Sequence, residues 1–443
     1  MHREKLFWKW LLYFNWGVIF FFWFKGSGSL LGGGLPSIAI ALGRLSGLSA
    51  AYMILLQFFF MGRMPYLERV FGLDTLSRLH HTNGNRGIIL LILHPILLVL
   101  GYSAISGLSL WGQFVEIITD YRHVIWAFVG FILFLTVVGV SIYIVRLRIR
   151  YESWYFVHLL AYLAVFSSFW HQIAVGEDII GNKLFYGYWV FLYIIVFTSH
   201  ITFRFIRPIY LFLRHRFSVA RILREAPDAV SIYIKGRALD RFFIRPGQFM
   251  IFRFLKKGMW WQAHPFSLSM VPNGKEIRIT VRELGDFTKQ LQNVPLGTPV
   301  FIDGPYGVFT DIFGLSQKTL FIAGGIGITP IRSLMEEMLI KGKDAALLYS
   351  NKLEKRIVFK NELQTLKEKY QANIVHILSD EQPKEAGEEY GYIDEEKIRR
   401  LVPDVAHRDV FLCGPPPMME KLVIILKGLG VTPKRIHFER FSL

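Results

Sequence analysis

The 443-residue sequence predicts a membrane domain of six helices, followed by a small antiparallel β-barrel and a doubly wound α/β domain. Three observations predict this fold class. First, 52% of the chain is apolar, and the apolar residues of its front half form segments near the ~20 residues that a helix needs to cross a bilayer. Second, short strand-like runs with turns between them follow Pro208. Third, buried strands then alternate with helical stretches.

The membrane domain is expected to occupy residues 1–210. Its predicted spans are 6–24, 36–61, 87–106, 123–145, 154–174 and 185–206. The first span is long, bulky and aromatic, and no small-residue cleavage site follows it, so it differs from a cleavable signal peptide. We therefore expect it to remain as a helix.

The net charge of +17 follows membrane topology rather than a nucleic-acid surface. Basic residues gather at one set of span ends: Arg3, Lys5, Lys9, Arg63, Arg69, Arg78, Arg146, Arg148, Arg150, Arg204, Arg207, Arg214 and Arg216. The opposite loops are rich in glycine or acidic residues, such as Glu177 and Asp178. The sequence therefore predicts a protein of the plasma or inner membrane, with both termini cytoplasmic, the lipid bilayer as a partner and no nucleic acid bound. The single cysteine, Cys413, excludes an internal disulfide.

Four histidines lie on two of the predicted helices: His80 precedes the third span, His94 lies within it, and His158 and His171 lie within the fifth. A polar side chain in lipid needs a partner, and haem iron is one that fits. On an ideal helix the fourteen-residue step from His80 to His94 turns about 1400° and rises about 21 Å, so both rings leave one face. The thirteen-residue step from His81 to His94 leaves these two rings about 140° apart around the helix, which makes His81 the weaker alternative to His80.

Both spans run from inside to outside, so His80 is expected to meet His158, and His94 to meet His171. The pairs would hold two b-type haems. His158 and His171 are thirteen residues apart, a step that does not place both rings on one face of a straight helix. Curvature or local overwinding of the helix would have to bring them into register. The alternatives are histidines that bond between helices, or pathway residues of a transporter or receptor with a nucleotide-sensing tail.

Arg44 lies about 12 Å from the outer end of span two at helical rise. A buried charge needs a counter-charge, and a haem propionate or a developing anion would supply one. The alternative is that the side chain reaches back to the outer interface.

The soluble tail is expected to form a domain at 211–314 and another at 315–443. The first has strand-like runs at 217–222, 229–235, 248–254, 276–283 and 299–302. In the second, the strands LFIAGG, AALLYS, NIVHIL and DVFLCG alternate with helical stretches such as 330–341. The turn GGIGITP after the first of these strands suits a dinucleotide pyrophosphate.

The motifs RPGQF, HPFSLS, GDFT, GPYG, GGIGITP and CGPPP follow one another between residues 245 and 417. This ordered series resembles the NADPH oxidase and ferric reductase family, whose cytoplasmic half looks like ferredoxin reductase. The resemblance covers nearly the whole chain, and the family pattern HxxxG at His80 to Gly84 also favours His80. It implies an FAD-binding β-barrel domain and an NAD(P)-binding α/β domain, with NADPH or NADH as co-substrate.

The resemblance also assigns residues to these cofactors. The flavin would be bound by Arg245, Gln248, His264, Pro265, Phe266, Ser267, Gly285 and Thr288, the last two at its pyrophosphate. The nicotinamide dinucleotide would be bound by Gly324, Gly325, Gly327, Thr329, Cys413, Gly414 and Pro415. The residues expected nearest the reacting groups are Ser267, Cys413, Phe441 and Arg44. Cys413 and Phe441 have simpler interpretations, as a small strand-end residue and a core aromatic.

The family resemblance implies an oxidoreductase that passes electrons to oxygen or to a ferric chelate outside the cytoplasm. Arg44 resembles the arginine near the outer haem where the oxidases meet oxygen, and so favours superoxide as product. In the family a histidine is expected one helical turn after the ligand of the outer haem, which here would be His94. Leu98 occupies that position, and so favours a metal reductase. Both acceptors remain open.

The choice of nucleotide and the regulation are also expectations. The series Asn351, Lys352, Lys355 and Arg356 follows the strand where a 2′-phosphate would lie, which favours NADPH. The sequence contains no EF-hand loop and no proline-rich tail, so we expect activity without an obligatory protein partner.

Overall fold

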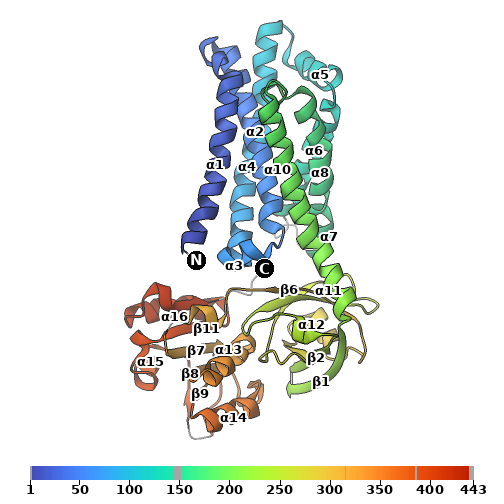
Figure 1. Ribbon diagram of the computed structural model, residues 1–443. Coiled ribbons are helices and arrows are strands. Elements are labelled where there is room, and N and C mark those ends of the chain that lie inside the picture. Colours follow the sequence, from blue (N-terminus) through green and yellow to red (C-terminus); the bar gives the residue numbers. More distant parts are fainter. Residues whose placement is uncertain (1, 144–150, 315, 385–386, 439–443) are drawn as a thin grey trace. The chain divides into compact units, whose positions relative to one another are not determined.

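The computed structural model describes residues 2–143, 151–314, 316–384 and 387–438. Arg146, Arg148, Arg150 and Phe441, which the sequence singled out, lie outside these ranges. The chain divides into two compact units. One comprises Met1–Val70 and Thr75–Phe203, and the other comprises Phe71–Asp74 and Arg204–Leu443. Each is described by itself (Figure 1).

The first unit is helical. Its helices are α1 (His2–Ser27), α2 (Leu35–Met61), α3 (Pro65–Phe71), α4 (Leu73–Ser106), α5 (Leu110–Asp120), α6 (Val124–Tyr143), α7 (Tyr151–His158), α8 (Leu160–Val175), α9 (Glu177–Ile180) and α10 (Lys183–Ile201), with a 3-10 turn at Gly28–Gly32. Among the described residues, five helical segments are long and apolar enough to cross a membrane: Leu35–Met61, Leu73–Ser106, Val124–Tyr143, Ser153–Val175 and Lys183–His215. α1 is a 26-residue helix at the place predicted for span one, but tryptophan, tyrosine, asparagine and lysine interrupt its apolar run. The sixth span therefore stays a prediction.

The predicted fifth span is broken into α7 and α8 at Leu159. Leu159 N–H is shared between the Tyr155 carbonyl at 3.1 Å, as in an α-helix, and the Phe156 carbonyl at 3.2 Å, and Tyr162 N–H donates to the Leu159 carbonyl at 3.1 Å in the tighter i→i+3 pattern. A 3-10 turn advances about 20° more per residue than an α-helix. The turn at Leu159 therefore adds only about 20–40° of rotation, a small part of the roughly 140° phase offset between His158 and His171.

The flavin-type domain of the second unit consists of two three-stranded antiparallel sheets, in the orders β1-β2-β5 and β4-β3-β6. The strands are β1 (Ser218–Ala226), β2 (Ala229–Lys235), β3 (Phe249–Phe254), β4 (His264–Ser267), β5 (Glu276–Arg282) and β6 (Val300–Tyr306). Bridges Ser218↔Pro299 and Leu268↔Ile279 connect the sheets around one apolar core. The five predicted strand runs are present, β4 was missed, and a closed barrel remains a prediction.

Helices α11 (Arg207–His215) and α12 (Asp286–Leu291) accompany these sheets. α11 follows a five-residue π-helical turn, Thr202–Ile206, and packs on β6, where the Phe212 and Phe301 rings lie 5.6 Å apart. Arg207 Nη2 donates to the Gly304 carbonyl at 2.8 Å. The start of the soluble unit is thus attached to the strand that leads into the GPYG motif.

The nucleotide-type domain is a six-stranded parallel sheet in the order β10-β9-β8-β7-β11-β12. The strands are β7 (Lys318–Gly324), β8 (Asp344–Asn351), β9 (Asn373–Leu378), β10 (Glu388–Tyr390), β11 (Asp409–Cys413) and β12 (Ile436–Phe438). Helices α13 (Ile328–Ile340) and α14 (Lys360–Tyr370) contribute to one apolar core, and α15 (Glu395–Leu401) and α16 (Pro416–Gly428) to another (Figure 1). This confirms the α/β domain, whose order reverses at β7.

Candidate functional site

The first histidine pair lies where α4 meets the end of α7. The His80 and His158 ring centroids are 6.0 Å apart, whereas His81 is exposed. His158 Nδ1 lies 3.3 Å from the Ser141 hydroxyl. His80 Nδ1 is buried and makes no hydrogen bond of normal geometry to any described residue. Two imidazoles thus face each other at one level of the helix bundle, as the helical phase of His80 predicts.

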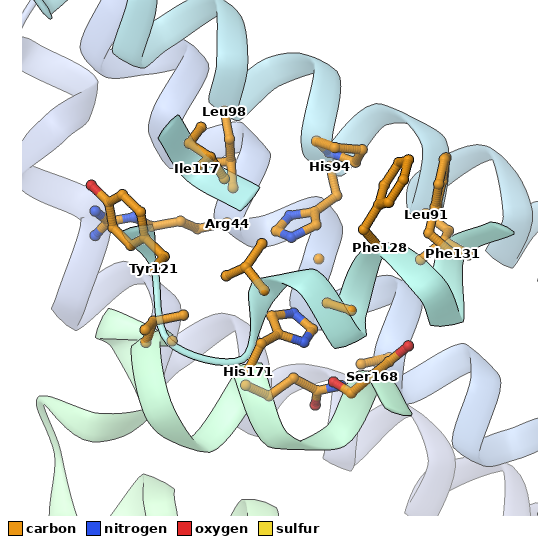
Figure 2. Close-up of a pocket in the computed structure, with 18 of the residues that line it drawn as sticks. Arg44, Leu91, His94, Leu98, Ile117, Tyr121, Phe128, Phe131, Ser168 and His171 are labelled. Atoms are coloured by element: carbon orange, nitrogen blue, oxygen red, sulfur yellow. The ribbon is translucent and has the colours of Figure 1, made fainter. Parts of the chain in front are cut away.

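The second pair lies in a cavity of about 560 Å³, lined mainly by α2, α4, α5, α6 and α8. Figure 2 shows His94 from α4 and His171 from α8 pointing into this space from opposite sides. His94 Nδ1 lies 2.7 Å from the Gly43 carbonyl. Because a carbonyl only accepts, Nδ1 must carry the proton, which leaves the Nε2 lone pair of His94 available to a metal.

A glycine on α2 makes room for this ring. A Cβ atom on Gly47 would lie 2.5 Å from His94 Nδ1, closer than side chains approach one another. The His94 imidazole is therefore held by a carbonyl one turn before Gly47 and by the bare backbone at Gly47 itself. Packing of this kind fixes the orientation of a ligand ring.

The donor set fits haem. The cavity volume lies within the roughly 300–1,000 Å³ of sites that enclose small ligands, and its wall is mostly apolar with a few polar groups. Each level offers two imidazoles, as a six-coordinate haem iron requires. Among the described residues, no group of three or more His, Cys, Asp or Glu side chains could hold a bare metal ion. Iron binding by these histidines rests on the pairs alone.

Arg44 lies at the end of the cavity beside Tyr121 (Figure 2). Its Nη2 is 2.5 Å from the Glu177 carboxylate and donates to the Tyr102 hydroxyl at 3.0 Å. Its Nη1 donates to Ser27, whose hydroxyl donates in turn to Asp178 at 2.7 Å. The charge thus has partners within the protein.

The residues of HPFSLS form β4, paired with β3 in the register Phe252↔His264 to Phe249↔Ser267. His264 stacks on Phe287, with ring centroids 3.9 Å apart. In the preceding RPGQF motif, Arg245 lies 3.8 Å from Asp311, and its N–H donates to Gln248 Oε1 at 2.8 Å. RPGQF thus leads into β3 at Phe249, beside the HPFS residues of β4, of which Pro265 and Phe266 are half-buried and Ser267 is buried.

The GDFT motif is occupied by its own hydrogen bonds. Thr288 Oγ1 accepts from Leu284 N–H at 2.9 Å and Gly285 N–H at 3.0 Å, and donates to the Gly285 carbonyl at 2.9 Å. The hydroxyl and amide expected to contact a pyrophosphate are therefore used to fold the start of α12. A ligand that bonds to them must replace these contacts.

The two nucleotide motifs meet at the carboxyl end of the parallel sheet. β7 ends at Gly324, Gly325–Gly327 form a 3-10 turn, and α13 follows with Thr329 in its first turn. A Cβ on Gly327 would lie 2.4 Å from the Cys413 carbonyl and 2.9 Å from Gly414 N. Cys413 is fully buried at the end of β11, and Pro415 is exposed. Ligands of open α/β sheets bind at such a reversal of strand order.

The candidates for a 2′-phosphate follow β8. Lys352, Lys355 and Arg356 are exposed, while Asn351 is only 5% exposed. Arg356 lies 3.8 Å from Asp228. Lys352 and Lys355 thus stay accessible at the carboxyl edge of the sheet.

Sequence reasoning missed several residues around these sites. It placed Glu177 and Asp178 only in an outer loop, and it did not select Tyr102 or the glycines at 43 and 47. Gly43 and Gly47 lie one helical turn apart on the same span as Arg44, and this spacing could have indicated a close approach of another group to that face of the helix. Nothing local to Glu177 indicates Arg44.

Family comparisons agree with this arrangement. Residues 46–169 match the ferric reductase-like transmembrane component, 236–310 an FAD-binding domain, and 321–423 an oxidoreductase NAD-binding domain. These matches define a flavin- and nicotinamide-binding oxidoreductase with a membrane domain. This order of domains matches the architecture of the NADPH oxidase and ferric reductase family.

The curated relatives named here each align with about half of this chain. The chain is 27% identical over 239 residues to the glycine betaine monooxygenase reductase subunit of Chromohalobacter salexigens, and 28% identical over 234 residues to the ferredoxin reductase component of 3-ketosteroid-9-alpha-monooxygenase from Rhodococcus rhodochrous. These alignments cover 52% and 51% of this chain and 64% of each relative. The FAD/NAD-binding domain of nitric oxide dioxygenase from Vibrio cholerae aligns with a TM-score of 0.46 and 24% identity, covering 51% of this chain and 97% of that domain.

Proposed function

We propose that this protein transfers electrons from cytoplasmic NADPH or NADH, through FAD and two b-type haems, to oxygen on the outer face of a membrane, with superoxide as the product. The observation that carries the proposal is the pairing of His80 with His158 and of His94 with His171 in one helix bundle. On α4 the two levels are about 21 Å apart at helical rise, which spans most of the ~30 Å hydrocarbon layer.

The histidines would bind iron through Nε2. For His94 the Gly43 carbonyl fixes the tautomer that this requires. His171 lines the same cavity, and its buried Nδ1 makes no hydrogen bond of normal geometry to a described residue. When bound, FAD takes up a hydride and releases its electrons singly, which the haem irons can carry one at a time.

Arg44 would stabilise negative charge that develops at the end of the cavity. Its guanidinium side chain is 17% exposed, and its partner Glu177 is 59% exposed. Because Glu177 reaches solvent, water screens part of its interaction with Arg44, and the guanidinium would still favour an anion at this end of the cavity. That arrangement suits the anion formed when oxygen gains one electron.

A ferric-chelate or other metal reductase is the second candidate. Leu98 favours it, because this side chain lines the cavity beside His94 and packs where a Cβ on Gly43 would approach it to 2.9 Å (Figure 2). An apolar leucine offers no hydrogen bond to bound oxygen. The same electron path would then serve a different acceptor.

The cellular setting completes the proposal. The protein would lie in the plasma or inner membrane with both termini cytoplasmic, in contact with the bilayer and a small-molecule acceptor. It would work without an obligatory protein partner and would bind no nucleic acid. The arginine-rich span ends support this orientation.

The test uses the full-length protein in detergent. Its spectrum should show two b-type haems per chain, and NADPH consumption should produce superoxide that superoxide dismutase removes. Ferric-chelate reduction measured at equal NADPH consumption separates the two acceptors. Purified protein without b-type haem absorbance would contradict electron transfer and favour a transporter or receptor with a nucleotide-sensing tail.

A further inference from the structure

A buried arginine joins the two domains of the soluble unit. Arg278 on β5 of the flavin-type domain has a side chain only 3% exposed. Its Nη1 and Nη2 donate to the two carboxylate oxygens of Glu362 on α14, at 2.5 and 3.0 Å. This bidentate geometry is the strongest form of arginine–carboxylate pair. Glu362 belongs to the nucleotide-type domain, so the pair crosses the domain boundary.

The same carboxylate holds a second arginine. Arg332 Nε on α13 lies 2.7 Å from Glu362 Oε2, and Arg332 Nη1 lies 2.6 Å from Glu336 one turn further along the helix. Burial opposes the charge of Glu362, but the hydrogen bond from Arg278 and the charges of both arginines outweigh it and lower its pKa. Glu362 therefore stays charged and links α13, which begins directly after the GGIG turn, to β5.

On the flavin side, Arg278 is bound to the end of HPFSLS. Its Nε donates to the Ser269 hydroxyl at 3.1 Å, and its Nη2 donates to the Ser269 carbonyl. The ring of Phe359 lies 4.6 Å from the guanidinium and covers it. Ser269, the last residue of the motif, is thereby connected through one side chain to the nucleotide-type domain.

A neighbouring residue on α13 makes a second connection. Ser333 is fully buried, its hydroxyl lies 3.0 Å from both the Leu268 and the Pro330 carbonyls, to which its one proton can be donated, and it accepts from Gly247 N–H at 3.2 Å. Leu268 belongs to HPFSLS and Gly247 to RPGQF. Ser333, the neighbour of Arg332 on α13, thus contacts both of the motifs expected to line the flavin.

We propose that Arg278, Glu362 and Arg332 are positioning residues for hydride transfer, because they fix β4 and the start of α13 relative to each other. The inference rests on the proposed function. In the transfer that they would position, one hydride passes from NADPH to FAD, which leaves NADP⁺ and, with one proton from water, FADH₂. Without the Glu362 charge, two buried guanidinium groups would face each other and drive the domains apart. A displacement near 1 Å of reacting atoms lowers rates on the order of 100-fold.

Glu362→Gln tests this in the full-length protein, with anaerobic stopped-flow reduction of the flavin by NADPH as the measurement. We expect the limiting rate to fall at least tenfold while FAD content is retained. Glu336→Gln is the matched control, because Glu336 pairs with Arg332 within the nucleotide-type domain alone. It should keep the wild-type rate.

Three results separate the possibilities. A wild-type limiting rate in Glu362→Gln, or an equal loss in Glu336→Gln, would overturn the inference. If Glu362→Gln does not fold, Arg278→Lys keeps the charge but loses the bidentate contact, and the same rate loss is expected; an unchanged rate refutes the inference. Failure of the wild-type protein to reduce its flavin with either nucleotide would instead refute the proposed function.

Discussion

Replacing Gly47 by alanine should remove one of the two haems that we propose. The new Cβ would lie 2.5 Å from His94 Nδ1, so the ring must move about 0.9 Å to reach the 3.4 Å of ordinary contact. Moving away from α2 lengthens the 2.7 Å bond to the Gly43 carbonyl toward about 3.6 Å, beyond hydrogen-bond range. The lost bond alone is worth about 1 kcal/mol, and the ligand ring loses its fixed orientation.

The measurement is haem and FAD per chain in purified protein. We expect Gly47→Ala to fall from two haems toward one, with FAD content and flavin reduction by NADPH retained. Gly187→Ala is the control, because no atom lies within 4 Å of a Cβ at that position on α10. Two haems with unchanged spectra in Gly47→Ala would refute the assignment of His94.

Three further predictions test other parts of the molecule. His80→Ala should lose the proposed haem between His80 and His158, and with it electron transfer to the acceptor, while flavin reduction persists. His81 is exposed, so His81→Ala should retain both haems and electron transfer. If His81→Ala loses a haem and His80→Ala does not, then His81 is the ligand. Lys352→Ala should raise the KM for NADPH severalfold more than that for NADH, and equal changes in steady-state assays would contradict a 2′-phosphate contact. Burial raises the pKa of Asp404, but hydrogen bonds from Arg408 and Lys318 outweigh this and lower it to about 2. A carboxylate whose pKa is lower in the folded state stabilises the fold at pH values above its unfolded-state pKa, and this stabilisation is lost as the pH falls through its folded-state pKa. Asp404→Asn should therefore lower the free energy of unfolding by about 1–2 kcal/mol at pH 7, and by progressively less between about pH 4 and pH 2. Thermal unfolding followed by circular dichroism measures the difference.

Helical phase favoured His80 over His81, and the shared direction of the two spans paired it with His158. The phase from His80 to His94 selected His80, and the structure places that ring against His158. Helical phase could not explain the thirteen-residue step from His158 to His171. The helix is interrupted at Leu159, where the sequence has no proline or glycine from which an interruption could be predicted. Local overwinding depends on packing that a sequence pattern does not display.

Polar contacts over long sequence distances were out of reach. Arg44 was expected to need an external counter-charge, yet Glu177 from a distant turn lies 2.5 Å away. Arg278 and Glu362 are likewise 84 positions apart, and each looks like an ordinary surface residue in its own segment. β4 was missed because a proline interrupts HPFS, and strand patterns seldom include one away from an edge.

The close approach of Gly327 to the Cys413 carbonyl makes the GGIG turn and the CGPPP turn a single mechanical element. Any side chain introduced at position 327 would displace the end of β11, and any shift of that strand would in turn move the GGIG turn. Engineers who wish to change coenzyme preference must therefore redesign both loops together, or confine substitutions to the lysines beyond β8.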